Sequence, residues 1–250
     1  MASPPPGDSP DEPKRKAITY EGKKYTFDPW QIVLFAVATP VFVIIFYELL
    51  EYAAWIRVIV ADHTISSLNF VTAMGATMTY RAGHMTYTTY TDLFNAVGAG
   101  TIFFSSVDEI SIIFGIPGRG NIEFVTFCTG FQAIIIFAGI IFFTPHSKDP
   151  GAAKGVWKRK FASLFWSSLI FYVVNIIRMW IQLYLYYIGF RWDDIHYSIS
   201  AASSFVAAII VLLMHRTLPE FVLSIVWTGV TIKDRFFPGL GYKQPVVKDA

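Results

Sequence analysis

The chain has 250 residues, of which 54% are hydrophobic and 17% aromatic, whereas only 15% are charged. Average soluble domains contain about 25% charged residues, so this composition argues against a soluble globular protein, and the aromatic content argues against disorder of most of the chain. The net charge of +2 argues against a nucleic-acid partner. The single cysteine, Cys128, excludes an intrachain disulfide, a cysteine-rich zinc site and a CxxC redox pair.

Long apolar segments dominate the chain. Residues 1–29 are rich in proline, lysine and aspartate, which predicts a disordered cytoplasmic tail with no cleavable signal peptide. Four segments are nearly free of charge and long enough to cross ~30 Å of hydrocarbon as helices: residues 30–47, 128–145, 161–190 and 197–214. Residues 64–80 and 93–107 are ambiguous, because the first is rich in serine and threonine and the second is short. We therefore predict an all-α, polytopic transmembrane helical bundle with four spans, or up to six.

Residues 80–127 have the weakest helical pattern. The sequence SIIFGIPGRGNIEFVTF, residues 111–127, has β-rich flanks around a glycine- and proline-rich turn, and it predicts a short outer hairpin before the helix that follows. A phosphate-binding role for GIPGRG is not favoured, because no GK[ST] follows. The chain thus divides into a tail (1–29), a transmembrane domain (30–216) and a cytoplasmic or interfacial tail (217–250), in which residues 221–232 are too short to span a membrane.

Lysine and arginine predict the orientation in the membrane. They cluster before the first span, between residues 148 and 160, and after the last span. Because such clusters favour the cytoplasmic side, all three lie there only if residues 51–127 cross the membrane twice or not at all. This orientation predicts a multi-pass protein of the cell membrane with Cys128 and the loop at 189–196 near the outer face.

Three polar side chains meet at one predicted depth. At ~1.5 Å of helical rise per residue, each of these side chains lies at a similar distance from the cytoplasmic end of its own predicted span. The distances are about 24 Å for Cys128, 26 Å for Arg178 and 27 Å for His196. Each has a structural explanation by itself: an inert buried thiol, a snorkelling arginine and an interfacial histidine. Together they are the parts of nucleophilic acyl transfer, and a cysteine that opens a helix is favoured as a thiolate by the helix macrodipole.

At these residues the chain resembles the exosortase and archaeosortase family of membrane cysteine transpeptidases. The family pattern is Cys-[Ser/Thr]-Gly at the start of one span, Asn-x-x-Arg in the next, and His or Arg after it. The matching sequences here are FCTGFQAIIIFAG and VVNIIRMW, and the matching positions are Cys128, Thr129, Gly130, Asn175, Arg178 and His196. The resemblance covers roughly residues 65–215, and the length favours an archaeosortase-like member.

The resemblance implies an enzyme that cleaves the C-terminal sorting signal of secreted proteins, built as a short motif, a transmembrane helix and a basic tail. The new C-terminus then passes to an acceptor, often a lipid, with no cofactor or metal. Cys128 would be the nucleophile, His196 the proton carrier and Arg178 the oxyanion clamp, with Arg216 as the alternative third catalytic residue. Supporting positions are Thr129, Gly130, Asn175, Gln132 and Glu48.

Two of these supporting residues are placed by spacing. Gln132 and Asn175 lie one turn from Cys128 and Arg178, respectively, where they are able to bridge helices by hydrogen bonds. Glu48 is level with the three candidates and is expected to pair with either Arg178 or Arg57.

The competing hypothesis is a non-enzymatic membrane protein, either a transporter or a lipid-binding scaffold, with a polar cavity inside the membrane. A transporter should show inverted repeats or paired broken helices, and the sequence shows neither. A hydrolase of another type lacks support, because no HExxH, GxSxG or paired intramembrane aspartate occurs.

Overall fold

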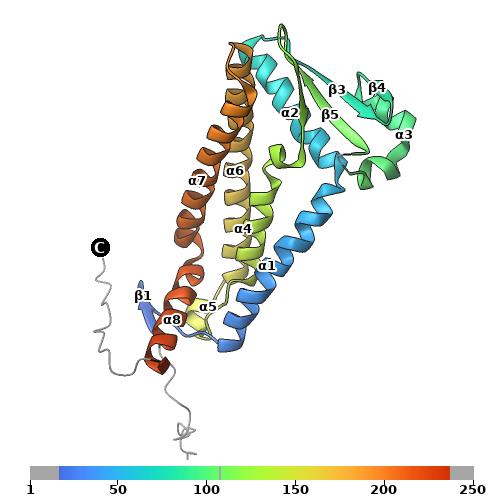
Figure 1. The fold of residues 1–250 in the computed structure, drawn as a ribbon. Helices are drawn as coiled ribbons and strands as arrows, with labels where there is room; N and C mark the ends of the chain where they lie inside the picture. The colour runs from blue at the N-terminus through green and yellow to red at the C-terminus, as the bar shows by residue number, and fades with distance from the viewer. Residues whose placement is uncertain (1–16, 107, 237–250) are drawn as a thin grey trace, which may run out of the picture.

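The computed structural model describes residues 17–106 and 108–236. Four helices run side by side along the molecule (Figure 1): α1 (Pro29–Glu51), α4 (Phe131–Phe143), α6 (Val156–Tyr187) and α7 (Trp192–Thr217). α4 packs between α1 and α6, and α7 packs on α6. Three of them, α1, α6 and α7, are long and apolar enough to cross a membrane.

The fourth predicted span is shorter than the sequence suggests. α4 has 13 residues, or about 20 Å of helix, and it begins at Phe131 rather than at Cys128. A buried lysine caps its C-terminal end. Lys160 Nζ donates hydrogen bonds to the carbonyl oxygens of Phe142 at 2.9 Å and Thr144 at 2.7 Å. Unpaired helix-end carbonyls are costly in an apolar environment, so this contact fixes where α4 ends.

One end of the molecule adds a sheet to the predicted helical bundle. It contains α2 (Ala54–Thr72), α3 (Tyr90–Phe104) and four strands: β3 (Thr77–Ala82), β4 (Met85–Tyr87), β5 (Ile110–Gly115) and β6 (Asn121–Phe124). The strands form one antiparallel sheet in the order β4-β3-β5-β6. The predicted hairpin is present as β5–β6, but it is half of a larger sheet, and the chain is a helical bundle capped by that sheet.

The two ambiguous segments do not form additional spans. The segment at 64–80 is divided, because α2 ends where Ala73 takes a left-handed conformation with φ 51°. The Asn69 side chain then pairs with both backbone groups of Ala76 and starts the turn into β3. The segment at 93–107 lies mostly in α3, which is broken by the non-helical Gly98, and Val107 lies outside the described residues. Since α3 is a helix, the prediction that residues 80–127 are the least helical part is only partly right.

The opposite end of the bundle carries β1 (Ile18–Tyr20), β2 (Lys23–Tyr25), α5 (Pro150–Ala153) and α8 (Pro219–Phe236) (Figure 1). The predicted disordered tail is therefore wrong for residues 17–29, whereas residues 1–16 lie outside the described chain. Tyr25 and Phe27 are buried against Leu223 and Trp227 of α8. The Arg159 guanidinium pairs with the fully buried carboxylate of Glu220 at this end.

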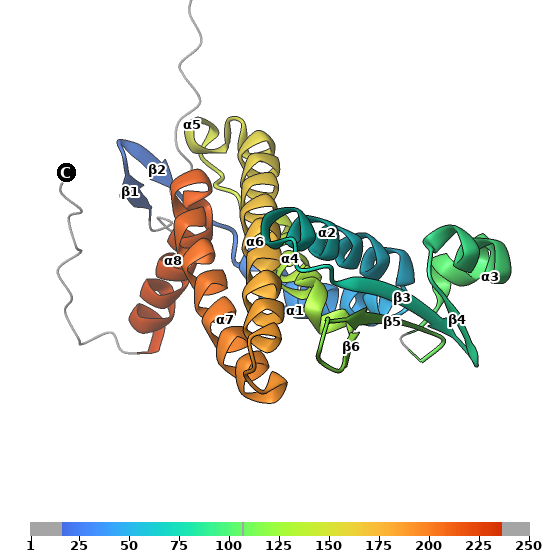
Figure 2. The same ribbon diagram turned by 90° about the horizontal axis from the view of Figure 1, so that it is seen from above.

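The largest buried cluster lies between α2, the sheet and the C-terminal half of α6. It includes Leu68 of α2, Phe114 of β5 and Met179 of α6, all fully buried, and Cys128 lies at its edge. Seen from above, α2 and the sheet lie on one side of α6, and α7 lies on the other (Figure 2). α6, which carries Asn175 and Arg178, therefore has neighbours on both sides.

Candidate functional site

Cys128 lies in a short 3-10 turn, η1 (Thr126–Thr129), that connects β6 to α4. Thr129 Oγ1 donates to the Thr126 carbonyl at 2.7 Å and accepts from the Phe131 amide at 3.3 Å. The thiol residue is only 2% exposed. Since α4 begins three residues after Cys128, and the macrodipole effect falls off within the first turn, the expected help of the helix to a thiolate is weaker than the sequence suggested.

Asn175 of α6 joins the cysteine turn to the neighbouring helix. Its Nδ2 donates to the carbonyl oxygens of Cys128 at 3.0 Å and Thr129 at 2.9 Å. Gly130, with φ +73°, lies directly against it, and a Cβ at this position would be 2.6 Å from Asn175 Cγ. Glycine is therefore required for both the left-handed backbone and the close approach, which gives a physical link between the two sequence motifs.

Arg178 lies one turn above Asn175 and contacts the same peptide group. Its Nη2 donates to the Cys128 carbonyl oxygen at 3.3 Å. Its Nε is buried and has no hydrogen-bond partner in the part of the chain that the structure describes. The guanidinium is close enough to interact electrostatically with both the Cys128 thiol and the His196 ring. Arg178 is thus the one of the three predicted residues that lies near both of the others.

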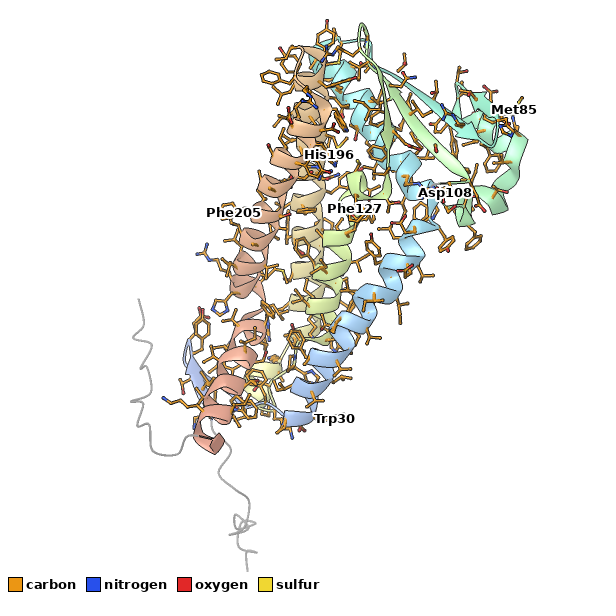
Figure 3. The ribbon with its side chains drawn as sticks, viewed as in Figure 1. Trp30, Met85, Asp108, Phe127, His196 and Phe205 are labelled. Carbon is orange, nitrogen blue, oxygen red and sulfur yellow. The ribbon has the colours of Figure 1, made fainter. Side chains whose placement is uncertain are left out.

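His196 lies in the first two turns of α7, at the same end of the bundle as Phe127, the residue before Cys128 (Figure 3). Its ring lies 5.4 Å from the ring of Trp192. Gln182 Nε2 donates a hydrogen bond to the His196 carbonyl oxygen at 3.4 Å. Nδ1 of the imidazole is buried and has no hydrogen-bond partner among the described residues. Within residues 17–106 and 108–236, His196 Nδ1 and Arg178 Nε are therefore both buried and without hydrogen-bond partners.

The remaining predicted residues lie elsewhere. Gln132 Nε2 is buried and, within the described residues, makes no bridge between helices. Glu48 is exposed, and Arg57 instead donates to backbone carbonyls, including that of Glu51 at 2.8 Å. Arg216 is exposed and lies 20 residues after His196 on α7, which corresponds to about 30 Å. It is therefore far from the cysteine turn.

Sequence reasoning missed two groups of residues around the site. Glu51, at the end of α1, accepts a hydrogen bond from Thr126 Oγ1 at 2.9 Å and so anchors the cysteine turn from the other side. Arg119, in the β5–β6 turn, donates to the Phe190 carbonyl at 3.1 Å and stacks over the Tyr186 ring. The GIPGRG sequence was the available signal for Arg119, but only the fold shows that this turn docks on the α6–α7 loop.

No cluster of three histidine, cysteine, aspartate or glutamate residues that could hold a metal ion occurs in residues 17–106 and 108–236. No family model, curated protein or solved structure matches the chain. What the fold and site define is a class: a helical bundle with membrane-spanning character, in which a buried thiol lies beside a half-buried arginine, with a half-buried histidine on the next helix.

Proposed function

We propose that this protein is a membrane-embedded cysteine transpeptidase of the exosortase and archaeosortase type. It would cleave C-terminal sorting signals of secreted proteins and transfer the new C-terminus to an acceptor, such as a lipid. The observation that carries the proposal is the shared contact at the Cys128 carbonyl, where Asn175 and Arg178 of one helix face hold the peptide that bears the thiol. Through this contact, the N-x-x-R motif positions the backbone of the C-T-G motif.

The proposed chemistry begins with transfer of the Cys128 thiol proton to His196 and attack of sulfur on the substrate carbonyl carbon. The free donor of Arg178 would stabilise the oxyanion that forms. The carbon–nitrogen bond then breaks, and His196 returns the proton to the leaving amine. An acceptor hydroxyl, amine or water attacks the thioester, and the thiol regains its proton.

The proposed orientation places the cysteine turn near the outer face of the cell membrane. The β1–β2 hairpin and the start of α6, whose sequences contain lysine and arginine, lie at the other end of the bundle (Figure 1). This separation agrees with the preference of lysine and arginine for the cytoplasmic side. Substrates with a secreted domain and one C-terminal helix would approach the bundle laterally.

The test is co-expression with secreted proteins from the same genome that end in a short motif, an apolar helix and a basic tail. Loss of the C-terminal helix is measured by immunoblot and mass spectrometry. We expect Cys128→Ala and Cys128→Ser to be inserted normally and to stop processing, since removal of one small side chain costs at most a few kcal/mol of stability. Undiminished processing in Cys128→Ala would falsify the mechanism.

A further inference from the structure

Glu51 is the last residue of α1, and its half-buried side chain contacts the start of the cysteine turn, η1. Its Oε2 accepts a hydrogen bond from Oγ1 of Thr126 at 2.9 Å, and Thr126 is only 1% exposed. A hydrogen bond to an ionised carboxylate is about twice as strong as one between neutral groups. The cysteine turn is therefore tied to α1 by a strong contact between residues that are 75 positions apart in the chain.

Two anchors hold the cysteine turn from opposite ends. At its start, the Thr126 side chain is held by Glu51, and the Thr126 carbonyl accepts from Thr129 Oγ1 at 2.7 Å. At its end, Asn175 of α6 donates to the carbonyl oxygens of Cys128 and Thr129. The turn has only four residues, so release of either end changes the direction of the Cys128 peptide.

Glu51 is itself held in place by Arg57 of α2. Nη1 of Arg57, a residue that is 1% exposed, donates to the Glu51 carbonyl oxygen at 2.8 Å. The guanidinium is also close enough to interact electrostatically with the Glu51 carboxylate. An ionisable side chain on a membrane-spanning helix is costly unless it is paired, and this carboxylate has both a cationic neighbour and a hydroxyl donor. Glu51 is therefore a fixed point from which the turn is positioned.

Arg178 is the group toward which the turn is held. Its Nη2 donates to the Cys128 carbonyl oxygen at 3.3 Å, and its guanidinium interacts electrostatically with the thiol. This hydrogen bond is slightly longer than the usual range of about 2.7–3.2 Å, so a small rotation of the peptide is enough to break it. The orientation of the Cys128 peptide thus decides whether the thiol and the guanidinium stay together.

We propose that Glu51 is a positioning residue for Cys128. Through the Thr126 hydroxyl it fixes the start of the cysteine turn, and it thereby keeps the thiol beside Arg178. Glu51 acts only through Thr126 and takes no part in the making or breaking of bonds. Its importance for the reaction rests on the proposed function, in which Cys128 is the nucleophile, whereas its effect on the thiol does not.

The experiment compares two reagents that alkylate the single cysteine of the full-length protein in detergent micelles. Iodoacetate is an anion and iodoacetamide is neutral, so the ratio of their rates reports whether the thiol lies beside the Arg178 guanidinium. Alkylation is followed by mass spectrometry. We expect Glu51→Leu to lower the ratio about fivefold, the effect of losing one close charge interaction. Removal of a negative charge would by itself favour the anionic reagent and raise the ratio, so a fall reports lost positioning.

Matched variants separate the hydrogen bond from the rest of the side chain. Thr126→Val replaces the hydroxyl donor with a methyl group and should lower the ratio as much as Glu51→Leu. The double variant should fall no further, because both changes remove the same interaction. Glu51→Gln and Thr126→Ser keep the hydrogen-bonding groups and should retain the ratio of the unaltered protein. Glu123→Leu removes an exposed carboxylate from β6 and is the control that should leave the ratio unchanged.

Processing of the sorting signal tests the consequence for the reaction. We expect Glu51→Leu to lower the processing rate per inserted protein about tenfold, the effect of losing one hydrogen bond to a charged group, and Glu51→Gln to process normally. An unchanged reagent ratio in Glu51→Leu, an equal fall in Glu51→Gln, or additive effects in the double variant would overturn the assignment, and so would undiminished processing in Glu51→Leu. Absence of processing in the unaltered protein would contradict the proposed function alone, since the reagent ratio still decides the role of Glu51.

Discussion

At the scale of single residues, Gly130 has the most constrained position near the candidate site. Gly155 has the same left-handed backbone conformation, with φ +71°. A Cβ added at Gly155 would meet no atom within 4 Å, whereas a Cβ added at Gly130 would collide with Asn175. The two glycines therefore separate backbone strain from loss of the Asn175 contact.

We expect Gly130→Ala to be much more harmful than Gly155→Ala. Both substitutions add about 1 kcal/mol of left-handed strain. Gly130→Ala also displaces Asn175 and leaves buried carbonyl groups unpaired, at a further cost of about 1–3 kcal/mol. Thermal unfolding in detergent measures the stability, and the rate of Cys128 alkylation by iodoacetamide reports the state of the turn. Equal melting temperatures of the two variants would contradict the role assigned to the Asn175 contact.

Arg178 is expected to be irreplaceable by lysine. The guanidinium is able to hold the Cys128 carbonyl and still offer Nε to a substrate, whereas an ammonium is a compact charge without a planar fork. We expect Arg178→Lys to lose about 100-fold in processing rate, the usual effect of removing an oxyanion donor, with a folded protein by circular dichroism. Near-normal turnover would reduce the role of the residue to bulk charge.

At the scale of elements, α7 separates the two candidates for the third catalytic residue. His196 is near the N-terminal end of this helix, and Arg216 is near its C-terminal end. The cysteine turn is fixed to α6 through Asn175, and α6 packs along α7. The 20 residues between His196 and Arg216 put the two candidates about 30 Å apart along α7.

We expect His196→Ala to lower processing about 100-fold or more, the range typical of a general acid–base residue. Arg216→Ala should leave the rate of processing unchanged and affect only membrane insertion, because an inner-face arginine contributes to orientation. Processing is normalised to the amount of inserted protein by immunoblot. The opposite ranking of the two variants would make Arg216 the third catalytic residue.

At the scale of the whole molecule, the bundle separates a sheet-capped end from a basic end (Figure 1). Arg57 shows how the capped end is held together, because its buried guanidinium donates to the carbonyls of Ser105, Ser106 and Ile110 as well as Glu51. This one side chain ties the start of α2 to the connection between α3 and β5. The cap is thereby fixed above the cysteine turn.

The orientation predicts opposite accessibility for the two ends of α7. In a Cys128→Ala background, Asp193→Cys and Arg216→Cys each provide one exposed thiol. We expect a membrane-impermeant maleimide to label intact cells at position 193 and not at position 216, with label at 216 only after permeabilisation. Label from the same side at both positions would mean that α7 does not cross the membrane.

The sequence by itself determined the helical, membrane-type character of this chain, because long uncharged segments at residues 30–47, 161–190 and 197–214 leave few alternatives. It also predicted the β5–β6 hairpin, since the glycine- and proline-rich turn at 115–120 is a local signal. Helical rise alone placed Cys128, Arg178 and His196 at one level. The catalytic use of these residues stays a prediction.

Only the tertiary structure decided the contacts that surround them. The short α4 depends on Lys160, which is 16 residues from Thr144, and the four-stranded sheet depends on pairing of β3 with β5 across α3. Glu51 accepts a hydrogen bond from Thr126, which is 75 residues away in the chain. The folded β1–β2 hairpin depends on packing against α8. Each of these contacts joins groups far apart in the chain, and local periodicity carries no information about them because it is set only by neighbours within a turn or a strand.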